Sequence, residues 1–118
     1  MTRPRIRLLI GDTVALGPGK AALLEAIVAT GSIASAARGM GMSYRRAWSL
    51  VQVMNADFTG PLVERAAGGR GGGGAVVTPL GLDAIERYRA MEARASAAVE
   101  ADLDGFAALL KPRDSDLT

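Results

Sequence analysis

The sequence contains no cysteine and no histidine. It therefore offers no disulfide, no Cys/His zinc site, no imidazole base and no thiol nucleophile. Charged residues also interrupt each apolar stretch before it reaches the ~18 residues that a membrane-spanning helix requires. The N-terminus lacks a compact apolar segment followed by a small-residue cleavage site. We therefore expect a non-enzymatic protein of the cytoplasm that uses no metal and no cofactor.

The residues that are present fit one globular domain of ordinary composition. The 118 residues are 49% hydrophobic and 22% charged, close to the averages for folded proteins. The net charge of +2 is unevenly distributed. Residues 1–78 carry nine basic and four acidic side chains, whereas residues 79–118 carry five basic and eight acidic ones. A basic body favours a polyanionic partner.

Hydrophobic periodicity, helix caps and glycine or proline breakers predict a mainly α-helical chain with a small β-hairpin. Ser32, Ser43 and Thr78 are good N-caps, and proline follows Thr78 at the first helical position. The predicted elements, in order, are a strand over 5–10, helices over 19–30, 32–38 and 43–57, strands over 62–66 and 75–78, and a long helix over 79–110.

The second and third predicted helices have the pattern of a helix-turn-helix. Ala37 is small enough for the contact between them, and Gly41 can adopt the positive φ that the turn needs. On the third helix, Ala47, Leu50, Val51 and Met54 form one apolar face. The opposite face presents side chains suited to the DNA major groove. They are Ser43, Tyr44, Arg45, Arg46, Ser49 and Gln52.

A second interpretation of this helix is also open. Arg45 and Arg46 would then be solvated surface residues of an ordinary three-helix core. Tyr44 and Trp48 lie toward the buried side of the helical wheel, so we expect them to pack between helices rather than stack on bases.

Six glycines occupy the seven positions 68–74. They do not form a phosphate-binding loop, because no Gly-Lys-Ser/Thr follows them. The run is either a bare flexible hairpin loop or a wing that lets Gly69, Arg70 and Gly71 approach a duplex, assisted by Arg65. Its position directly after a helix-turn-helix favours the wing.

The long terminal helix carries an apolar stripe at steps of three and four residues. A helix of about 30 residues extends over ~45 Å, which exceeds the width of a small body. We therefore expect part of the stripe to pack on a second copy of the chain. The alternative is a helix that folds back at Gly105 onto its own domain. The stripe residues that we assign to the dimer are Leu82, Ile85, Tyr88, Met91, Val99, Leu103 and Phe106.

Several segments together resemble the N-terminal DNA-binding domain of the ModE-type molybdate-responsive regulators, which is itself similar to the LysR-type DNA-binding domain. The resemblance covers about residues 5–110. The segments that carry it are Gly31–Ala37, Met42–Trp48, Met54-Asn55, Pro61–Arg65, Gly68–Ala75 and Leu80-Gly81.

The resemblance implies a winged helix-turn-helix transcription factor that represses oxyanion-uptake genes from a palindromic operator. It also implies a dimer in which the first helix, through Leu23 and Ile27, joins the long terminal helix. The residues assigned to double-stranded DNA are Ser32, Ser43, Tyr44, Arg45, Arg46, Ser49, Gln52, Arg65, Gly69, Arg70 and Gly71.

The sequence departs from this family in one respect. ModE-type regulators that sense molybdate carry oxyanion-binding domains after this one, whereas this sequence ends at Thr118. We therefore expect no molybdate site in this chain. A single-domain regulator without a direct effector, a chain that pairs with a separate sensor, and a fragment of a longer protein are all compatible with the sequence.

The expected organisation is a DNA-binding body over 1–78, a dimerisation helix over 79–111 and a disordered tail over 112–118. The runner-up function is an interaction module that heterodimerises with a full-length ModE-type regulator without binding DNA. The arginines on the third helix argue against it, because such a module has no use for them.

Overall fold

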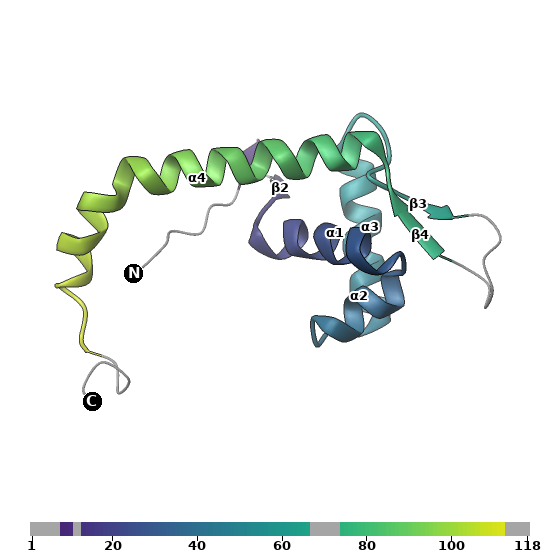
Figure 1. Ribbon diagram of the computed structural model, residues 1–118, viewed down its shortest axis with the longest axis horizontal. Coiled ribbons are helices and arrows are strands. Elements are labelled where there is room, and N and C mark those ends of the chain that lie inside the picture. Colours follow the sequence, from purple (N-terminus) through teal and green to yellow (C-terminus); the bar gives the residue numbers. More distant parts are fainter. Residues whose placement is uncertain (1–7, 11–12, 67–73, 113–118) are drawn as a thin grey trace.

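The computed structural model describes residues 8–10, 13–66 and 74–112, and shows a helical body with a two-stranded wing and one long terminal helix (Figure 1). Its fold class is the predicted winged helix-turn-helix. The elements are β1 (Leu8–Ile10), β2 (Thr13–Leu16), α1 (Pro18–Thr30), α2 (Ile33–Gly39), α3 (Tyr44–Asp57), β3 (Val63–Ala66), β4 (Gly74–Val77) and α4 (Pro79–Ala107).

The strands form two separate antiparallel pairs. β1 pairs with β2, and β3 pairs with β4 in a register that sets Val63 opposite Val77 and Ala66 opposite Gly74. The sequence prediction of the strands was incomplete, because it assigned no strand to residues 13–16. Residues 13–16 (Thr-Val-Ala-Leu) do not alternate strictly between polar and apolar, so the strand is defined by its partner rather than by its own pattern.

The predicted caps and turns are confirmed. Ser32 Oγ accepts a hydrogen bond from the Ser35 amide, Ser43 Oγ from the Arg46 amide, and Thr78 Oγ1 from the Gly81 amide. Each hydroxyl thereby satisfies an amide that the first turn of its helix leaves unpaired. Gly31 ends α1 with φ +70°, and Gly41 turns the chain between α2 and α3 with φ +69°.

The core lies where α1, α2, α3 and the wing meet. Leu23, Leu24 and Ile27 of α1 are buried in it, with small alanines of α2 and the apolar face of α3 around them. Tyr88 of α4 is also buried there, so the core continues past the predicted boundary at residue 78.

The start of α4 passes very close to the wing. A Cβ placed on Gly81 would lie 2.5 Å from the carbonyl oxygen of Leu62 and 2.6 Å from the side chain of Val77. Only glycine permits this approach. Thr78 supports it by donating its hydroxyl to the Pro61 carbonyl oxygen at 2.7 Å.

Beyond the body, α4 continues as a single helix (Figure 1). It passes through Gly105 without folding back onto the domain, and ends at Ala107 rather than near Leu110 as predicted. Phe106, Leu109 and Leu110 are exposed. In the part of the chain that the structure describes, no helix is both long enough and apolar enough to cross a membrane.

Candidate nucleic-acid interface

The third helix divides into the two predicted faces. Ala47, Val51 and Met54 are buried in the core, and Leu50 packs partly against it. The opposite face is open to solvent. Its exposed side chains are Ser43, Tyr44, Arg45, Arg46, Ser49 and Gln52.

Tyr44 does not pack between helices as the helical wheel suggested. Its side chain is 53% exposed, because Tyr44 is the first residue of α3 and the body does not cover that end of the helix. Trp48, one turn later, is half-buried and does pack against the core. The prediction was therefore wrong for Tyr44 and right for Trp48.

The turn between α2 and α3 is fixed by backbone hydrogen bonds. The Met42 amide donates to the Ala37 carbonyl oxygen at 3.0 Å, and the Gly41 amide donates to that of Arg38. Ala37 and Ala36 are fully buried where the two helices meet. The small residues let the helices approach, and this contact sets the direction in which α3 presents its exposed face.

Asn55, near the end of α3, attaches the wing to this helix. Its side-chain carbonyl oxygen accepts hydrogen bonds from the amides of Leu62 and Val63, at 2.8 and 3.2 Å, and its Nδ2 donates to the Val63 carbonyl oxygen. The sequence prediction gave Asn55 no role in the site. A single polar residue after an apolar face carries no sequence signal for such a contact.

The second wing strand, β4, is attached to the body near the residue at which it begins. The Ala75 amide donates to the carbonyl oxygen of Gly31, in the connection between α1 and α2, at 2.9 Å. The loop-side end of β4 therefore lies beside the connection that leads into α2. The predicted wing residues Gly69, Arg70 and Gly71 lie outside the described residues.

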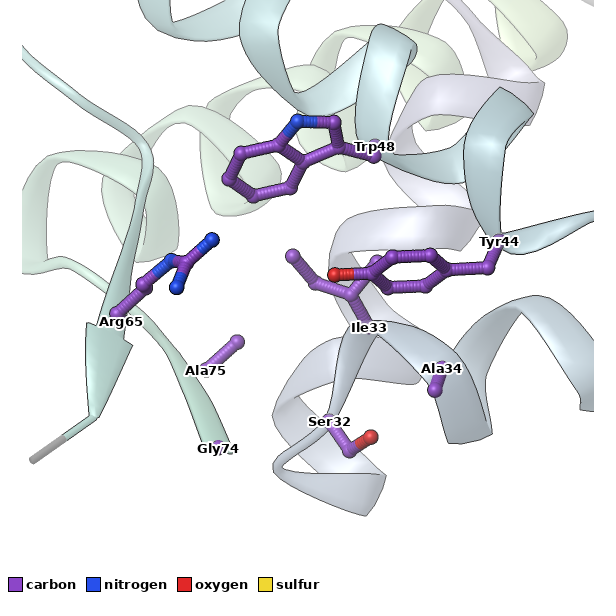
Figure 2. Close-up of a pocket in the computed structure, with 8 residues that line it drawn as sticks. All are labelled: Ser32, Ile33, Ala34, Tyr44, Trp48, Arg65, Gly74 and Ala75. Carbon is purple, nitrogen blue, oxygen red and sulfur yellow. The ribbon is translucent and has the colours of Figure 1, made fainter. Parts of the chain in front are cut away.

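A cleft of about 240 Å³ lies between the start of α2, α3 and the wing strands (Figure 2). Arg65 of β3 and Trp48 of α3 meet across it, with the guanidinium carbon 5.3 Å from the centre of the indole ring. That distance is within the range of a cation–π interaction. The predicted DNA residues Ser32, Tyr44 and Arg65 thus come together at one cleft. Its lining residues are Ser32, Ile33, Ala34, Tyr44, Trp48, Arg65, Gly74 and Ala75.

The structure corrects part of the predicted dimer surface. Leu23, Ile27 and Tyr88 have at most 1% of their surface exposed, so they belong to the core of this chain and cannot form a surface for another. A helical stripe does not distinguish residues that face the same domain from residues that face a partner. Of the other predicted residues, Leu82, Met91, Val99 and Phe106 are exposed and Leu103 is half-buried, whereas Ile85 is half-buried and packs against the core.

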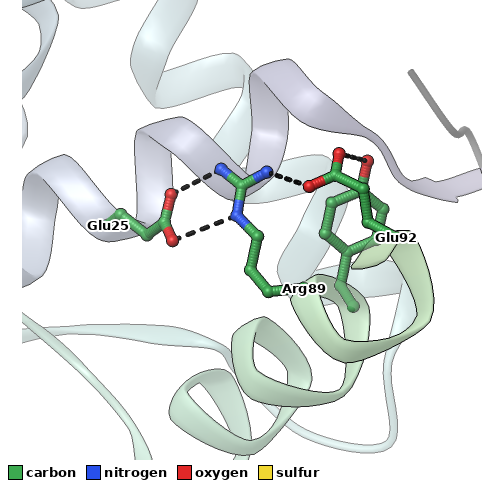
Figure 3. A network of polar contacts seen from close by, with 4 residues as sticks. Glu25, Arg89 and Glu92 are labelled. Atoms are coloured by element: carbon green, nitrogen blue, oxygen red, sulfur yellow. Dashed lines mark hydrogen bonds and ion pairs between the residues drawn. The ribbon is translucent and has the colours of Figure 1, made fainter. Parts of the chain in front are cut away.

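A polar network joins α4 to α1 beside Tyr88 (Figure 3). Arg89 binds both carboxylate oxygens of Glu25 and also donates to Glu92, which in turn accepts from the Tyr88 hydroxyl at 3.4 Å. The hydrogen bond to Glu25 raises the pKa of Arg89, so its charge persists at all relevant pH values. Burial raises the pKa of Tyr88, which keeps the phenol neutral.

The described residues contain no group of three or more acidic, histidine or cysteine side chains placed to hold a metal ion. The features that the structure does bring together are an exposed cationic helix, a wing fixed beside it and a cleft between the two. The electrostatics of this face favour an anionic partner.

Comparison with known sequences also indicates a helix-turn-helix domain. The sequence profile of the bacterial regulatory helix-turn-helix proteins of the lysR family matches residues 20–82. The chain is 51% identical over 78 residues to the molybdenum-pterin-binding protein MopB of Rhodobacter capsulatus, which covers 66% of this chain and 29% of MopB. It is 45% identical over 71 residues to the DNA-binding transcriptional dual regulator ModE of Escherichia coli K12, covering 60% of this chain and 27% of that protein.

The chain thus spans less than a third of the length of these relatives. Among solved structures, a crystal structure of a CbnR_DBD–DNA complex superposes with a TM-score of 0.58 at 21% sequence identity. The match covers 74% of this chain and 94% of that one, and it shows that the two share a fold.

Proposed function

This chain belongs to the lysR family of bacterial regulatory helix-turn-helix proteins, and we propose that it binds operator DNA as a homodimer and regulates transcription in the cytoplasm. The observation that carries the proposal is the exposed face of α3. Arg45, Arg46 and Ser49 are uncovered on a helix whose opposite face is locked into the core. An exposed helix of this kind fits the major groove of a duplex.

We assign the two kinds of DNA contact to different side chains. Arg45 pairs with the O6 and N7 atoms of a guanine, and Gln52 pairs with an adenine. Arg38, Arg46 and Arg65 contact phosphates, and we assign the same role to Arg70, which lies outside the described residues. Such contacts supply much of the affinity and make it fall as salt rises.

The dimer that we propose uses the outer part of α4. Met91, Val99 and Phe106 leave apolar surface exposed on one side of this helix, and Val99 and Phe106 lie beyond the part that packs on the body. A two-fold dimer through that side would place two α3 helices about one turn of DNA apart, roughly 34 Å, on a palindromic operator.

We further propose that the regulated genes serve the uptake or metabolism of molybdate or a related oxyanion, and that the regulator represses them. The support is the identity to ModE and MopB within the winged helix. We assign no molybdate-binding residue in this chain.

Selection of bound sequences from random duplex DNA, with and without molybdate or tungstate, tests the proposal. We expect a palindromic motif with half-sites one helical turn apart. Recovery of no motif, together with a stable mixed complex between this chain and a full-length ModE-type regulator, would favour the interaction module instead.

A further inference from the structure

The cleft between α3 and the wing brings together polar side chains from two different elements, which the proposed contacts of α3 with the major groove do not use. The Tyr44 hydroxyl and the Arg65 guanidinium point into it from opposite sides, and the Trp48 indole forms one wall (Figure 2). Tyr44 and Arg65 are both exposed to solvent, so their polar groups are available to a ligand.

The chemistry of the lining residues selects an anion. Arg65 offers several N–H donors and a permanent charge, and Tyr44 offers one O–H donor. None of the eight lining residues carries a carboxylate, so among the residues that the structure describes no lining side chain neutralises Arg65. The apolar side chains of Ile33 and Ala75 line the space between the donors.

Trp48 restricts where the charge of Arg65 lies. With the guanidinium 5.3 Å from the ring centre, the indole favours a position of the long side chain over the cleft. Less conformational entropy is then lost when a ligand binds, which strengthens the interaction.

We propose that this cleft binds one phosphodiester of the DNA backbone in each half-site, with Arg65 and Tyr44 as the two donors and Trp48 as the residue that positions Arg65. The assignment rests on the proposed DNA-binding function. The cleft lies between the helix proposed for the major groove and the wing, where the backbone separating two adjacent grooves would pass. The bound phosphate would fix the register of α3 without reading a base.

The first test replaces single phosphates of the selected duplex by neutral methylphosphonates. We expect one position in each half-site at which the replacement weakens wild-type binding about tenfold. Arg65→Gln and Tyr44→Phe should weaken binding to the unmodified duplex, by about tenfold and threefold. Arg65→Gln should also lose most of its sensitivity at that same position, whereas Tyr44→Phe, which keeps the charged Arg65, should lose only part of it.

Further variants distinguish the contribution of the Arg65 charge from that of its planar shape. Arg65→Gln should lower the slope of log affinity against log salt by about one, whereas Arg65→Lys should keep the slope and still bind more weakly, because lysine lacks the planar group that lies on Trp48. Arg87→Gln is the matched control. Arg87 is an exposed arginine of α4, paired with Asp83 and not among the residues of the cleft, so this variant should keep the wild-type profile.

A free oxyanion shares the tetrahedral chemistry of a phosphodiester, so a second arm titrates phosphate and molybdate into the DNA-free protein. Trp48 is the sole tryptophan of the chain, and its fluorescence reports on the cleft. We expect no saturable change at millimolar anion. A saturable fluorescence change that Arg65→Gln abolishes would overturn the phosphodiester assignment. So would Arg65→Gln and Tyr44→Phe variants that are as sensitive as the wild type to methylphosphonate replacement at every position, provided that the wild-type protein binds DNA. A wild-type protein that binds no duplex would overturn the proposed function itself.

Discussion

Arg89 of α4 binds Glu25 of α1 through two hydrogen bonds, with Nη2 2.6 Å from Oε1 and Nε 3.1 Å from Oε2. The two residues are 64 positions apart, so this paired contact joins the long helix to the body directly. Glu92 holds the third corner of the guanidinium at 2.9 Å. Because a planar guanidinium restricts both distance and direction, the contact fixes the angle at which α4 leaves the domain.

Arg89→Met should test this contact. We expect a loss of about 1 kcal/mol in the free energy of unfolding, since both side chains are partly exposed and solvent weakens the pair. Urea denaturation measures this loss. In the proposed dimer, the variant should also tolerate half-site spacings that the wild-type protein rejects, because the exit angle of α4 is less fixed.

The control for Arg89 is Arg87→Met. Arg87 pairs with Asp83 one turn away on the same helix, so it joins no second element, and both side chains are well exposed. Its loss should change the free energy of unfolding by less than about 0.5 kcal/mol and leave the spacing preference intact. Equal effects of the two variants would contradict the role given to Arg89.

Gly81→Ala should destabilise the protein although alanine is the better helix former. The added Cβ would lie 2.5 Å from the Leu62 carbonyl oxygen, which would push α4 away from the wing at a cost of about 1–3 kcal/mol. Gly105→Ala is the matched control on the same helix. No atom of the described residues lies within 4 Å of a Cβ there, so it should stabilise by up to about 1 kcal/mol. Thermal melting should show a lower melting temperature for Gly81→Ala and a higher one for Gly105→Ala.

Asn55→Ala should loosen the wing. The substitution removes three hydrogen bonds and leaves the amide of the fully buried Leu62 without its acceptor, so we expect a loss of about 2–3 kcal/mol. Gln52→Ala, on the exposed face of the same helix, should barely change stability but should weaken binding to the selected duplex. Hydrogen exchange at the Leu62 and Val63 amides should become faster in Asn55→Ala. Unchanged exchange rates would count against this role.

Arg45→Ala should weaken DNA binding without altering the fold. Arg45 is exposed and its loss leaves the core intact, so the melting temperature should stay within about 2 °C of the wild type. Affinity should fall about tenfold or more, with relaxed preference at one base pair. Arg94→Ala, another exposed arginine but on α4, is the control. Equal affinity of both variants in a gel shift would remove Arg45 from the interface.

Met91→Glu should separate the proposed dimer. A carboxylate in an apolar interface loses its hydration without gaining a partner, whereas the exposed site in the monomer tolerates it. Ala97→Glu is the control. Ala97 is also exposed, but lies well away from Met91 around the helix. Sedimentation velocity should show monomers only for Met91→Glu, and a wild-type protein that is already monomeric would exclude the dimer.

Much of the local structure followed from the sequence, because local rules govern it. Ser32, Ser43 and Thr78 cap helices through their own hydroxyls, and Gly41 turns the chain through its own φ. The two faces of α3 followed from its spacing alone. These features depend on residues within one turn of each other, so a single sequence contains them.

The sequence therefore determined which segments become helices, where they begin, and that α3 has a cationic face. Tertiary packing decided what no local pattern contains. It buried Tyr88, Leu23 and Ile27 inside one domain, exposed Tyr44, brought Arg65 over Trp48, and placed Asn55 and Arg89 as links between distant elements. The physical reason is that an apolar stripe or a single polar residue fixes what a side chain needs to contact, whereas only the folded chain fixes which partner is within reach.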